Sequence, residues 1–345
     1  MESFLSHMPD NLRLSSLTLP GRNSCFVASA LAFYGWPISQ CQSQNTPLSV
    51  QLNSGIRVLD VRLAVVDSKL IAYHGSYPQK TPYQHVLSDI HSFLTSPLSC
   101  RETIVISIKQ EDYQKTPVKV FSSLVHDEIF NGPGGSDMWF FENRIPSLGE
   151  VRGKVVLLSR FGGDGNEWEN GLEGLGIHPT AWPDSEKFGF SWQCKDTLVR
   201  THDWYAIPSF LAIPEKVERA TRILVEAEPP NNPPFPVLSI SYTSAASFPL
   251  AMPPTVAKGF GWPQVGFGVE GVNSRVARWL LDAFSRDDTD GQLGKASSGE
   301  AEKFSKTLST LEPKIRGWVF MDFYQEPVES GIIHLLVECN YRGRR

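Results

Sequence analysis

The sequence predicts an α/β fold in which parallel strands form a barrel surrounded by helices. Hydrophobic segments of strand length alternate with segments whose apolar residues recur at helical spacing, and this alternation continues along the whole chain. It gives about seven strands, and such a pattern is typical of parallel strands joined by helical crossovers. The composition does not change between the two halves. We therefore expect one domain over 1–345 with its core at 14–336, and we favour a closed barrel over an open sheet, although a distorted or incompletely closed barrel also fits.

The first predicted elements lie before and after the strand that the sequence defines best. Residues 14–21 predict a polar entry and a short strand that is broken by Pro20 and Gly21. Residues 46–53 predict a short helix. Residues 55–63 form the clearest strand because β-branched and aliphatic residues fill most of its positions. A second short strand at 69–73 then leads to His74.

The later elements continue the same alternation. Further strands are predicted at 103–109, 154–160, 197–204, 237–242 and 317–323, and helices at 82–98, 118–130, 215–226, 272–284 and 331–339. Glycine-rich residues 162–176 predict a loop on the side of the active site. Residues 229–234 predict a proline-rich surface linker, and we expect residues 285–303 to form a mobile insertion.

Composition narrows the class of protein. A hydrophobic content of 41% is ordinary for a globular protein, and a net charge of −5 argues against nucleic acid as a partner. The first twenty residues lack the pattern of a secretory signal, and no apolar run reaches the length of a membrane span. The five cysteines are scattered without zinc-type spacing, at 25, 41, 100, 194 and 339. Free thiols in a reducing compartment are the simplest account, so we expect a cytoplasmic protein.

Ionisable residues follow the predicted strands repeatedly. In a barrel of parallel strands, catalytic groups lie at the carboxyl ends of the strands. Asp60 and Arg62 are two residues apart and therefore share a face, and His74 ends the next strand. The other strand-end groups are Lys109, Arg160, Asp203 with Tyr205, and Asp322. Each alone can be explained as a charge that reaches solvent, but together they predict a site suited to phosphate chemistry.

Short segments in a fixed order resemble the X-type catalytic barrel of phosphatidylinositol-specific phospholipase C in its small, metal-independent microbial form. The resemblance covers residues 14–336 and implies a TIM-type (β/α) barrel. The matching segments are Leu-Pro-Gly at 19–21, Cys-Gln at 41–42, Gly-Ile-Arg at 55–57, Asp-Val-Arg at 60–62, His-Gly at 74–75, Ile-Ser-Ile-Lys-Gln at 106–110, Ile-Pro-Ser-Leu-Gly at 145–149, Asp-Trp-Tyr at 203–205 and Met-Asp-Phe at 321–323.

The resemblance implies a role for each strand-end residue. Arg62 would neutralise the phosphate with support from Asp60, and His74 would protonate the leaving alcohol. Asp322 would orient the histidine that acts as general base. Lys109, Arg160, Asp203 and Tyr205 would line the pocket for a small-molecule or lipid head group.

No cofactor or metal is expected in this site. The glycerophosphodiester phosphodiesterases, a related barrel family, use two carboxylates at the spacing of Asp60 and Arg62 to hold a divalent metal. A guanidinium cannot ligate a metal ion, so Arg62 indicates metal-independent chemistry.

The sequence departs from the family where the general base is expected. After Leu-Pro-Gly the family has Thr-His-Asp-Ser, whereas residues 22–25 here are Arg-Asn-Ser-Cys. Asn23 stands in place of the base histidine, and an amide cannot accept a proton near neutral pH. Ordinary phospholipase activity should therefore be weakened. Arg22 could join Arg62 in binding an anion or pair with Asp322, which could itself serve as base. His202 should face the surrounding helices and does not replace the base.

Three functions remain open from the sequence. The first is a phospholipase-C-like phosphodiesterase with weakened chemistry, and the second is a barrel repurposed for acid-assisted cyclisation or isomerisation of a molecule without phosphate. The third is a pseudoenzyme that binds inositol lipids. Phe33, Tyr34 and Trp36 follow the first strand and could touch a membrane surface, but we favour covered pocket walls because no basic cluster lies nearby.

Overall fold

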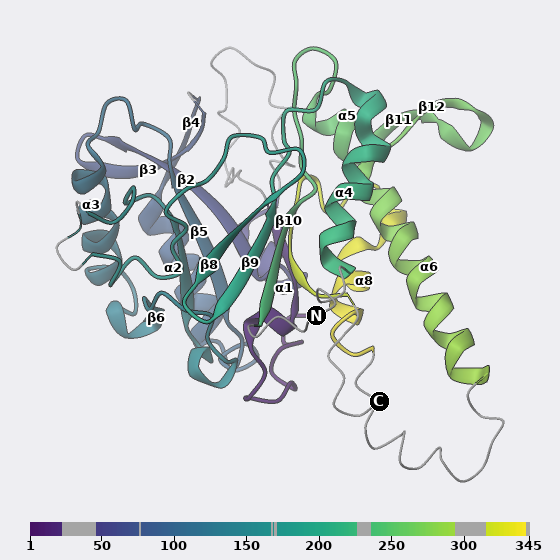
Figure 1. Ribbon diagram of the computed structural model, residues 1–345. Helices are drawn as coiled ribbons and strands as arrows, with labels where there is room; N and C mark the ends of the chain where they lie inside the picture. Colours follow the sequence, from purple (N-terminus) through teal and green to yellow (C-terminus); the bar gives the residue numbers. More distant parts are fainter. Residues whose placement is uncertain are drawn as a thin grey trace, which may run out of the picture.

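The fold is seen in a computed structural model, which describes residues 1–22, 46–75, 77–166, 168, 171–225, 236–293 and 315–342 (Figure 1). A curled sheet runs in the order β6-β7-β5-β2-β1-β13-β10-β9-β8, with β3 and β4 continuing from β2. Its strands are β1 (Thr18–Arg22), β2 (Val58–Val66), β3 (Lys69–His74), β4 (Tyr77–Pro82), β5 (Ile104–Gln110), β6 (Trp139–Phe140), β7 (Val155–Arg160), β8 (Phe190–Cys194), β9 (Thr197–His202), β10 (Val237–Tyr242) and β13 (Gly317–Met321).

The sheet is an incompletely closed α/β barrel. Strands β7, β5, β2, β1, β13, β10 and β9 are parallel, which confirms the predicted α/β class. Among the described residues, the end strands β6 and β8 do not pair, so the barrel has the incompletely closed form that the sequence also allowed. The reason lies at both edges. Strand β6 has only two residues, and β8 is the antiparallel partner of β9 in a hairpin, so no helical crossover carries a strand across the gap.

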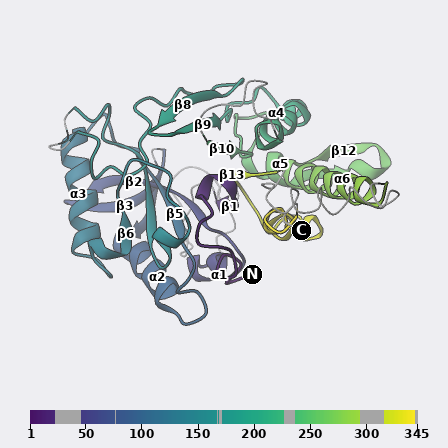
Figure 2. The same cartoon turned by 60° about the horizontal axis from the view of Figure 1, so that its bottom comes forward.

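Helices flank both halves of the sheet (Figures 1 and 2). Those beside the β2–β5–β7 half are α2 (Tyr83–Thr95) and α3 (Val118–Phe130), while α4 (Ile213–Val225), α6 (Val272–Leu293) and α8 (Ile332–Glu338) lie beside the other half. Two short helices are α1 (Leu48–Asn53) and α5 (Pro253–Lys258). Helix α6 continues nine residues past the predicted end, into the segment expected to be a mobile insertion, whose residues 294–303 lie outside the described chain.

The first strand contains the residues that were predicted to break it. Pro20 and Gly21 lie inside β1, which pairs with β13 over its full length. The proline is tolerated because β1 pairs with β2 only from Gly21 onward, so the missing N–H of Pro20 falls where that ladder has not begun. Gly21 is also needed, since a Cβ there would lie 3.0 Å from the Val319 carbonyl oxygen.

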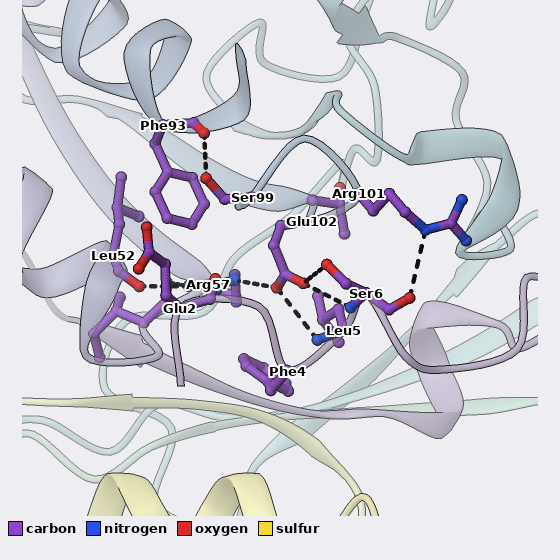
Figure 3. A network of polar contacts seen from close by, with 12 residues as sticks. Glu2, Phe4, Leu5, Ser6, Leu52, Arg57, Phe93, Ser99, Arg101 and Glu102 are labelled. Carbon is purple, nitrogen blue, oxygen red and sulfur yellow. Dashed lines mark hydrogen bonds and ion pairs between the residues drawn. The ribbon is translucent and has the colours of Figure 1, made fainter. Parts of the chain in front are cut away.

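The amino-terminal end of the barrel is closed by a buried ion pair (Figure 3). Arg57 and Glu102, just before β2 and β5, have fully buried side chains, and Arg57 Nε donates to Glu102 Oε2 at 2.8 Å. Glu102 also accepts the backbone N–H groups of Leu5 and Ser6. The N-terminal segment is thereby fixed across the end of the barrel that is opposite to the strand carboxyl ends.

Two further observations concern the cysteines and the helices. Cys100, Cys194 and Cys339 are free thiols, and the two remaining cysteines lie outside the described residues. Within the part of the chain that the structure describes, no helix is both long enough and apolar enough to cross a membrane.

Candidate functional site

Three cationic side chains stand level with one another at the carboxyl ends of adjacent strands. Arg62 of β2 is paired with Lys109 of β5, and Lys109 is paired with Arg160 of β7. Residues directly opposite each other in neighbouring strands project to the same face, so the three form one row. Asp60 precedes Arg62 by two residues and shares its face. The strand register thus brings together four of the predicted site residues.

Asp60 is the anion at the centre of this group. Its side chain is fully buried, and its two oxygens contact Arg62 Nε at 2.9 Å and Arg160 Nη1 at 3.4 Å. Ser107 Oγ donates a further hydrogen bond at 3.2 Å. Burial alone would raise the pKa of Asp60, but the two guanidinium groups outweigh it and hold the pKa below its ordinary value. Asp60 is therefore an ionised anchor for the cations and not a proton carrier.

Arg62 is held by a second carboxylate that the sequence analysis missed. Arg62 Nη1 lies 3.4 Å from Glu111 Oε1, and Lys109 Nζ lies 3.8 Å from Glu111 Oε2. Burial would lower the pKa of Arg62, but Asp60 and Glu111 raise it above the ordinary value. Burial and the nearby Arg62 lower the pKa of Lys109. The guanidinium is thus fixed between two carboxylates while 18% of its side chain stays exposed toward solvent.

Arg160 connects the cation row to the opposite half of the barrel. Its Nη2 lies 3.7 Å from Asp203 Oδ2, and its guanidinium lies over the Trp182 ring at 4.0 Å. Trp182 Nε1 donates to Asp203 at 2.9 Å. Tyr242 stacks on Phe320 with ring centroids 4.4 Å apart, and its hydroxyl lies 3.4 Å from Arg160. These groups form a cluster of aromatic side chains and paired polar groups beside the cation row.

Tyr205 stands at the outer edge of this cluster. Its hydroxyl donates to Asp184, and this hydrogen bond, together with burial, raises the pKa of Tyr205 to about 12. Trp182, Asp184 and Glu111 were not predicted because they lie in loops without hydrophobic periodicity. Tyr242 could have been found, since it is the polar last residue of the predicted strand 237–242.

His74 is the last residue of β3, which runs antiparallel to β2 with Leu63 opposite Ala72, so the chain at His74 lies beside the carboxyl-terminal part of β2. Asp322 follows β13 directly, two residues beyond Phe320 of the aromatic stack. Asn23 lies outside the described residues, as do Phe33, Tyr34 and Trp36.

Arg22 does not join the cation row. It is paired with Leu59 of β2 and Met321 of β13, whereas Gly21 is the residue level with Phe320. Because successive residues alternate between faces, Arg22 projects to the face opposite to that of Asp60 and Phe320. Its charge acts on Tyr324. The strand register thus sets Arg22 apart from the cation row, and its part in anion binding stays a prediction.

Lys216 of α4 is a buried cation behind the pocket. Its side chain is fully enclosed, and Nζ donates to the Trp204 carbonyl at 2.7 Å. Burial lowers its pKa to about 7, although Asp203 and Asp322 act in the opposite direction. Lys216 lies among other charged residues in its helix, and such a position is normally exposed. The hydrophobic periodicity therefore gave no indication that this lysine is buried.

The depressed pKa of Lys216 predicts a pH dependence of stability. Between about pH 7 and its ordinary pKa of 10.5, the unfolded chain holds a proton that the folded chain has lost, so the free energy of unfolding should rise with pH. The slope is at most about 1.4 kcal/mol per pH unit. Urea unfolding between pH 7.5 and 9.5 should show this rise for the wild type and a weaker one for Lys216→Met. The exposed-residue control Lys119→Met should keep the wild-type slope, and equal slopes in all three proteins would contradict the assignment.

Comparisons with known proteins show which family the chain resembles. Residues 26–161 match the family model described as phosphatidylinositol-specific phospholipase C, X domain. The chain is 25% identical over 236 residues to the 1-phosphatidylinositol phosphodiesterase of Staphylococcus aureus strain Newman, covering 67% of this chain and 72% of that protein. It is 29% identical over 170 residues to the enzyme of the same name from Listeria monocytogenes, covering 46% and 48%.

Solved structures show the same fold. A phosphatidylinositol-specific phospholipase C from S. aureus superposes with a TM-score of 0.66 at 18% identity, over 98% of this chain and 97% of that one. The L. monocytogenes enzyme gives a TM-score of 0.59 at 21% identity, over 98% of both chains. Fold and site define an α/β-barrel protein with a row of cations at the strand carboxyl ends. Within that class the chain is similar to the phosphatidylinositol-specific phospholipases C, and the resemblance predicted from the sequence is confirmed.

Proposed function

We propose that this protein is a phospholipase-C-type phosphodiesterase that cleaves the phosphodiester of an inositol-phosphate head group, with chemistry weakened by the missing base. The observation that carries the proposal is the row of Arg62, Lys109 and Arg160 around the ionised Asp60. A row of cations of this kind binds an anion. The relatives named 1-phosphatidylinositol phosphodiesterase act on a phosphodiester, which is such an anion.

The reaction needs a fixed cation and a proton donor. An inositol hydroxyl attacks the phosphorus, the bond from phosphorus to the departing alcohol oxygen breaks, and His74 donates the proton that this oxygen takes up. Arg62 stabilises the charge that develops on the phosphate oxygens, and its position between Asp60 and Glu111 is set before substrate binds. The hydroxyl proton passes to Asp322 or to solvent. A cyclic inositol phosphate is the first product, so the step is of the lyase type.

The pocket beside the cation row suits a ring that bears hydroxyl groups. Arg160 and Asp203 place a donor and an acceptor side by side, and Lys109 and Tyr205 add polar groups at the opening. Each inositol hydroxyl can both donate and accept a hydrogen bond.

The same contacts favour metal-independent chemistry. Asp60 and Glu111 are the carboxylates in contact with Arg62, and carboxylates are groups that could ligate a cation. Both are already engaged by Arg62, and Asp60 also by Arg160. A guanidinium supplies the positive charge that a divalent ion would otherwise supply.

Arg62→Lys tests the proposal. Lysine keeps the charge but loses the planar fork, so we expect release of cyclic inositol phosphate from phosphatidylinositol vesicles to fall by about 10²–10³. The loss should be measured in the wild type and again with Asn23→His, which enlarges the measurable range. Arg144→Lys is the matched control, because Arg144 also bridges two carboxylates but lies outside the site. Absence of cleavage in every variant would overturn the proposal and favour the repurposed barrel or the pseudoenzyme.

A protruding apolar hairpin supports a lipid surface as the partner. Strands β11 (Gly259–Trp262) and β12 (Phe267–Glu270) project from the body of the protein in both views (Figures 1 and 2). Trp262 is 70% exposed, Val265 79% and Phe267 66%. Residues 259–269 contain no charge, and they follow β10 at the end of the barrel that carries the site. An uncharged aromatic tip of this kind is suited to insertion at a bilayer interface.

The hairpin predicts a loss of vesicle binding without a loss of chemistry. Each aromatic side chain contributes about 1.5–3 kcal/mol when buried, so Trp262→Ser and Phe267→Ser should each weaken vesicle affinity by at least about tenfold. Hydrolysis of soluble cyclic inositol phosphate should not change. Leu98→Ser, which removes an equally exposed apolar side chain elsewhere, should bind vesicles like the wild type. Sedimentation with phosphatidylcholine vesicles measures this, and unchanged binding of both hairpin variants would contradict the prediction.

A further inference from the structure

A second cavity lies on the outer side of the sheet, away from the cation row. Its volume is about 340 Å³, and it is enclosed by the β8–β9 hairpin and helix α4. Residues of β9 alternate between the two faces, so Asp203 points to the inner pocket while Arg200 and His202 line this outer cavity. No residue placed in the proposed active site lines it.

The lining of this cavity is strongly cationic. It contains Arg200 from β9 with Arg219 and Arg222 from α4, and it contains no aspartate or glutamate. Arg219 is paired with Glu215, whose Oε1 lies 3.0 Å from Arg219 Nη2 and 2.8 Å from Lys187 Nζ, so this carboxylate is shared between two cations. The Arg219 guanidinium lies over the Phe188 ring at 4.5 Å, which fixes its plane at the entrance.

A buried histidine forms part of the wall. His202 is 1% exposed, and neither ring nitrogen has a hydrogen bond of normal geometry among the described residues, although the Lys187 backbone lies near enough to raise its pKa. Burial, Lys216 and Arg219 lower its pKa to about 3, so the ring is neutral at physiological pH. A neutral imidazole presents one N–H donor and one acceptor nitrogen. A ligand in the cavity would satisfy groups that the protein leaves unsatisfied.

We propose that this outer cavity is a second binding site, which takes a phosphate group carried by a small phosphorylated ligand. Guanidinium groups match phosphate oxygens in pairs, and three of them converge on one cavity from a strand and a helix. A phosphate monoester that keeps one proton also offers both an acceptor and a donor to His202. The site does not depend on the proposed phosphodiesterase activity, since it is built on the other face of β9.

The ¹⁵N signals of the His202 ring provide a local test. Inorganic phosphate and glycerol 1-phosphate should shift these signals in a saturable manner, with the signals assigned by comparison with His202→Gln. Arg222→Gln should raise the Kd at least tenfold, and Arg200→Gln should do the same. Arg278→Gln, an exposed arginine of α6, is the control and should leave the Kd unchanged. Circular dichroism of each variant verifies that it is folded.

A vesicle arm identifies the source of the phosphate. Phosphatidic acid carries a phosphate monoester on a lipid, so binding to vesicles that contain it, lost in Arg222→Gln, would indicate a membrane ligand. A shift with soluble phosphates alone would indicate a metabolite. Either result supports the site. His202 signals that respond to none of these probes, or a Kd that Arg222→Gln and Arg200→Gln leave unchanged, would overturn it, and neither result bears on turnover in the inner pocket.

Discussion

Replacing Asn23 by histidine is expected to raise the rate of phosphatidylinositol cleavage by about 10²–10⁴, the usual contribution of a general base. Asn23 follows the last residue of β1, and β1 lies between β2, which carries Asp60, and β13, which precedes Asp322. The anion-binding half of the site is present, whereas an amide cannot accept the proton of the attacking hydroxyl. The measurement is release of cyclic inositol phosphate from vesicles, for the wild type and Asn23→His side by side.

Two further variants make this result specific. Asn23→Gln is the matched control, because it changes the side chain without supplying a base, and it should be as slow as the wild type. If Asp322 orients the new histidine, adding Asp322→Asn to Asn23→His should remove much of the gain. A wild type as fast as Asn23→His would show that another group already acts as base. Asp322→Asn in the wild-type background would then identify or exclude Asp322.

Elements with a strong hydrophobic period were predictable from the sequence. The bounds of α3 agree with the predicted 118–130, and those of β10 with 237–242. The β11–β12 hairpin was not among the predicted strands, since glycines fill its sequence and its apolar residues are exposed. Closure of the barrel was also beyond sequence reasoning, because it depends on how two strands distant in the chain meet at the edges.

Those site residues whose place follows from their position along a strand were predictable from the sequence. Arg62, Lys109 and Arg160 follow from the rule that barrel sites lie at strand carboxyl ends. The face on which Arg22 lies could not be predicted, because it depends on the register of β1 against its neighbours, and a shift of one residue reverses it. Lys216 was missed because a charged residue on a helix normally faces solvent, and only tertiary packing encloses it here.

Replacing Glu102 by alanine is expected to lower the free energy of unfolding by about 3–5 kcal/mol, since it leaves the Arg57 guanidinium buried without a counter-charge. Both side chains are fully buried, and Phe4 and Phe93 lie against the guanidinium at 5.1 Å and 4.8 Å (Figure 3). Water therefore cannot replace the lost carboxylate. Burial already lowers the pKa of Arg57, which shows how much the charge depends on its partner. Urea unfolding at neutral pH measures the loss.

Variants of the Arg57–Glu102 pair can separate two causes of the expected destabilisation, namely an unpaired buried charge and the loss of hydrogen bonds. Arg57→Met combined with Glu102→Leu removes both charges, so it should recover most of the stability that Glu102→Ala loses. Glu150→Ala breaks the more exposed Arg144–Glu150 pair, whose separation is a similar 2.6 Å, and should cost less than about 1 kcal/mol. Because Glu102 also accepts the N–H groups of Leu5 and Ser6, its loss should increase amide exchange in the N-terminal segment. A double variant no more stable than Glu102→Ala would mean that these backbone hydrogen bonds, rather than the unpaired arginine, account for the effect.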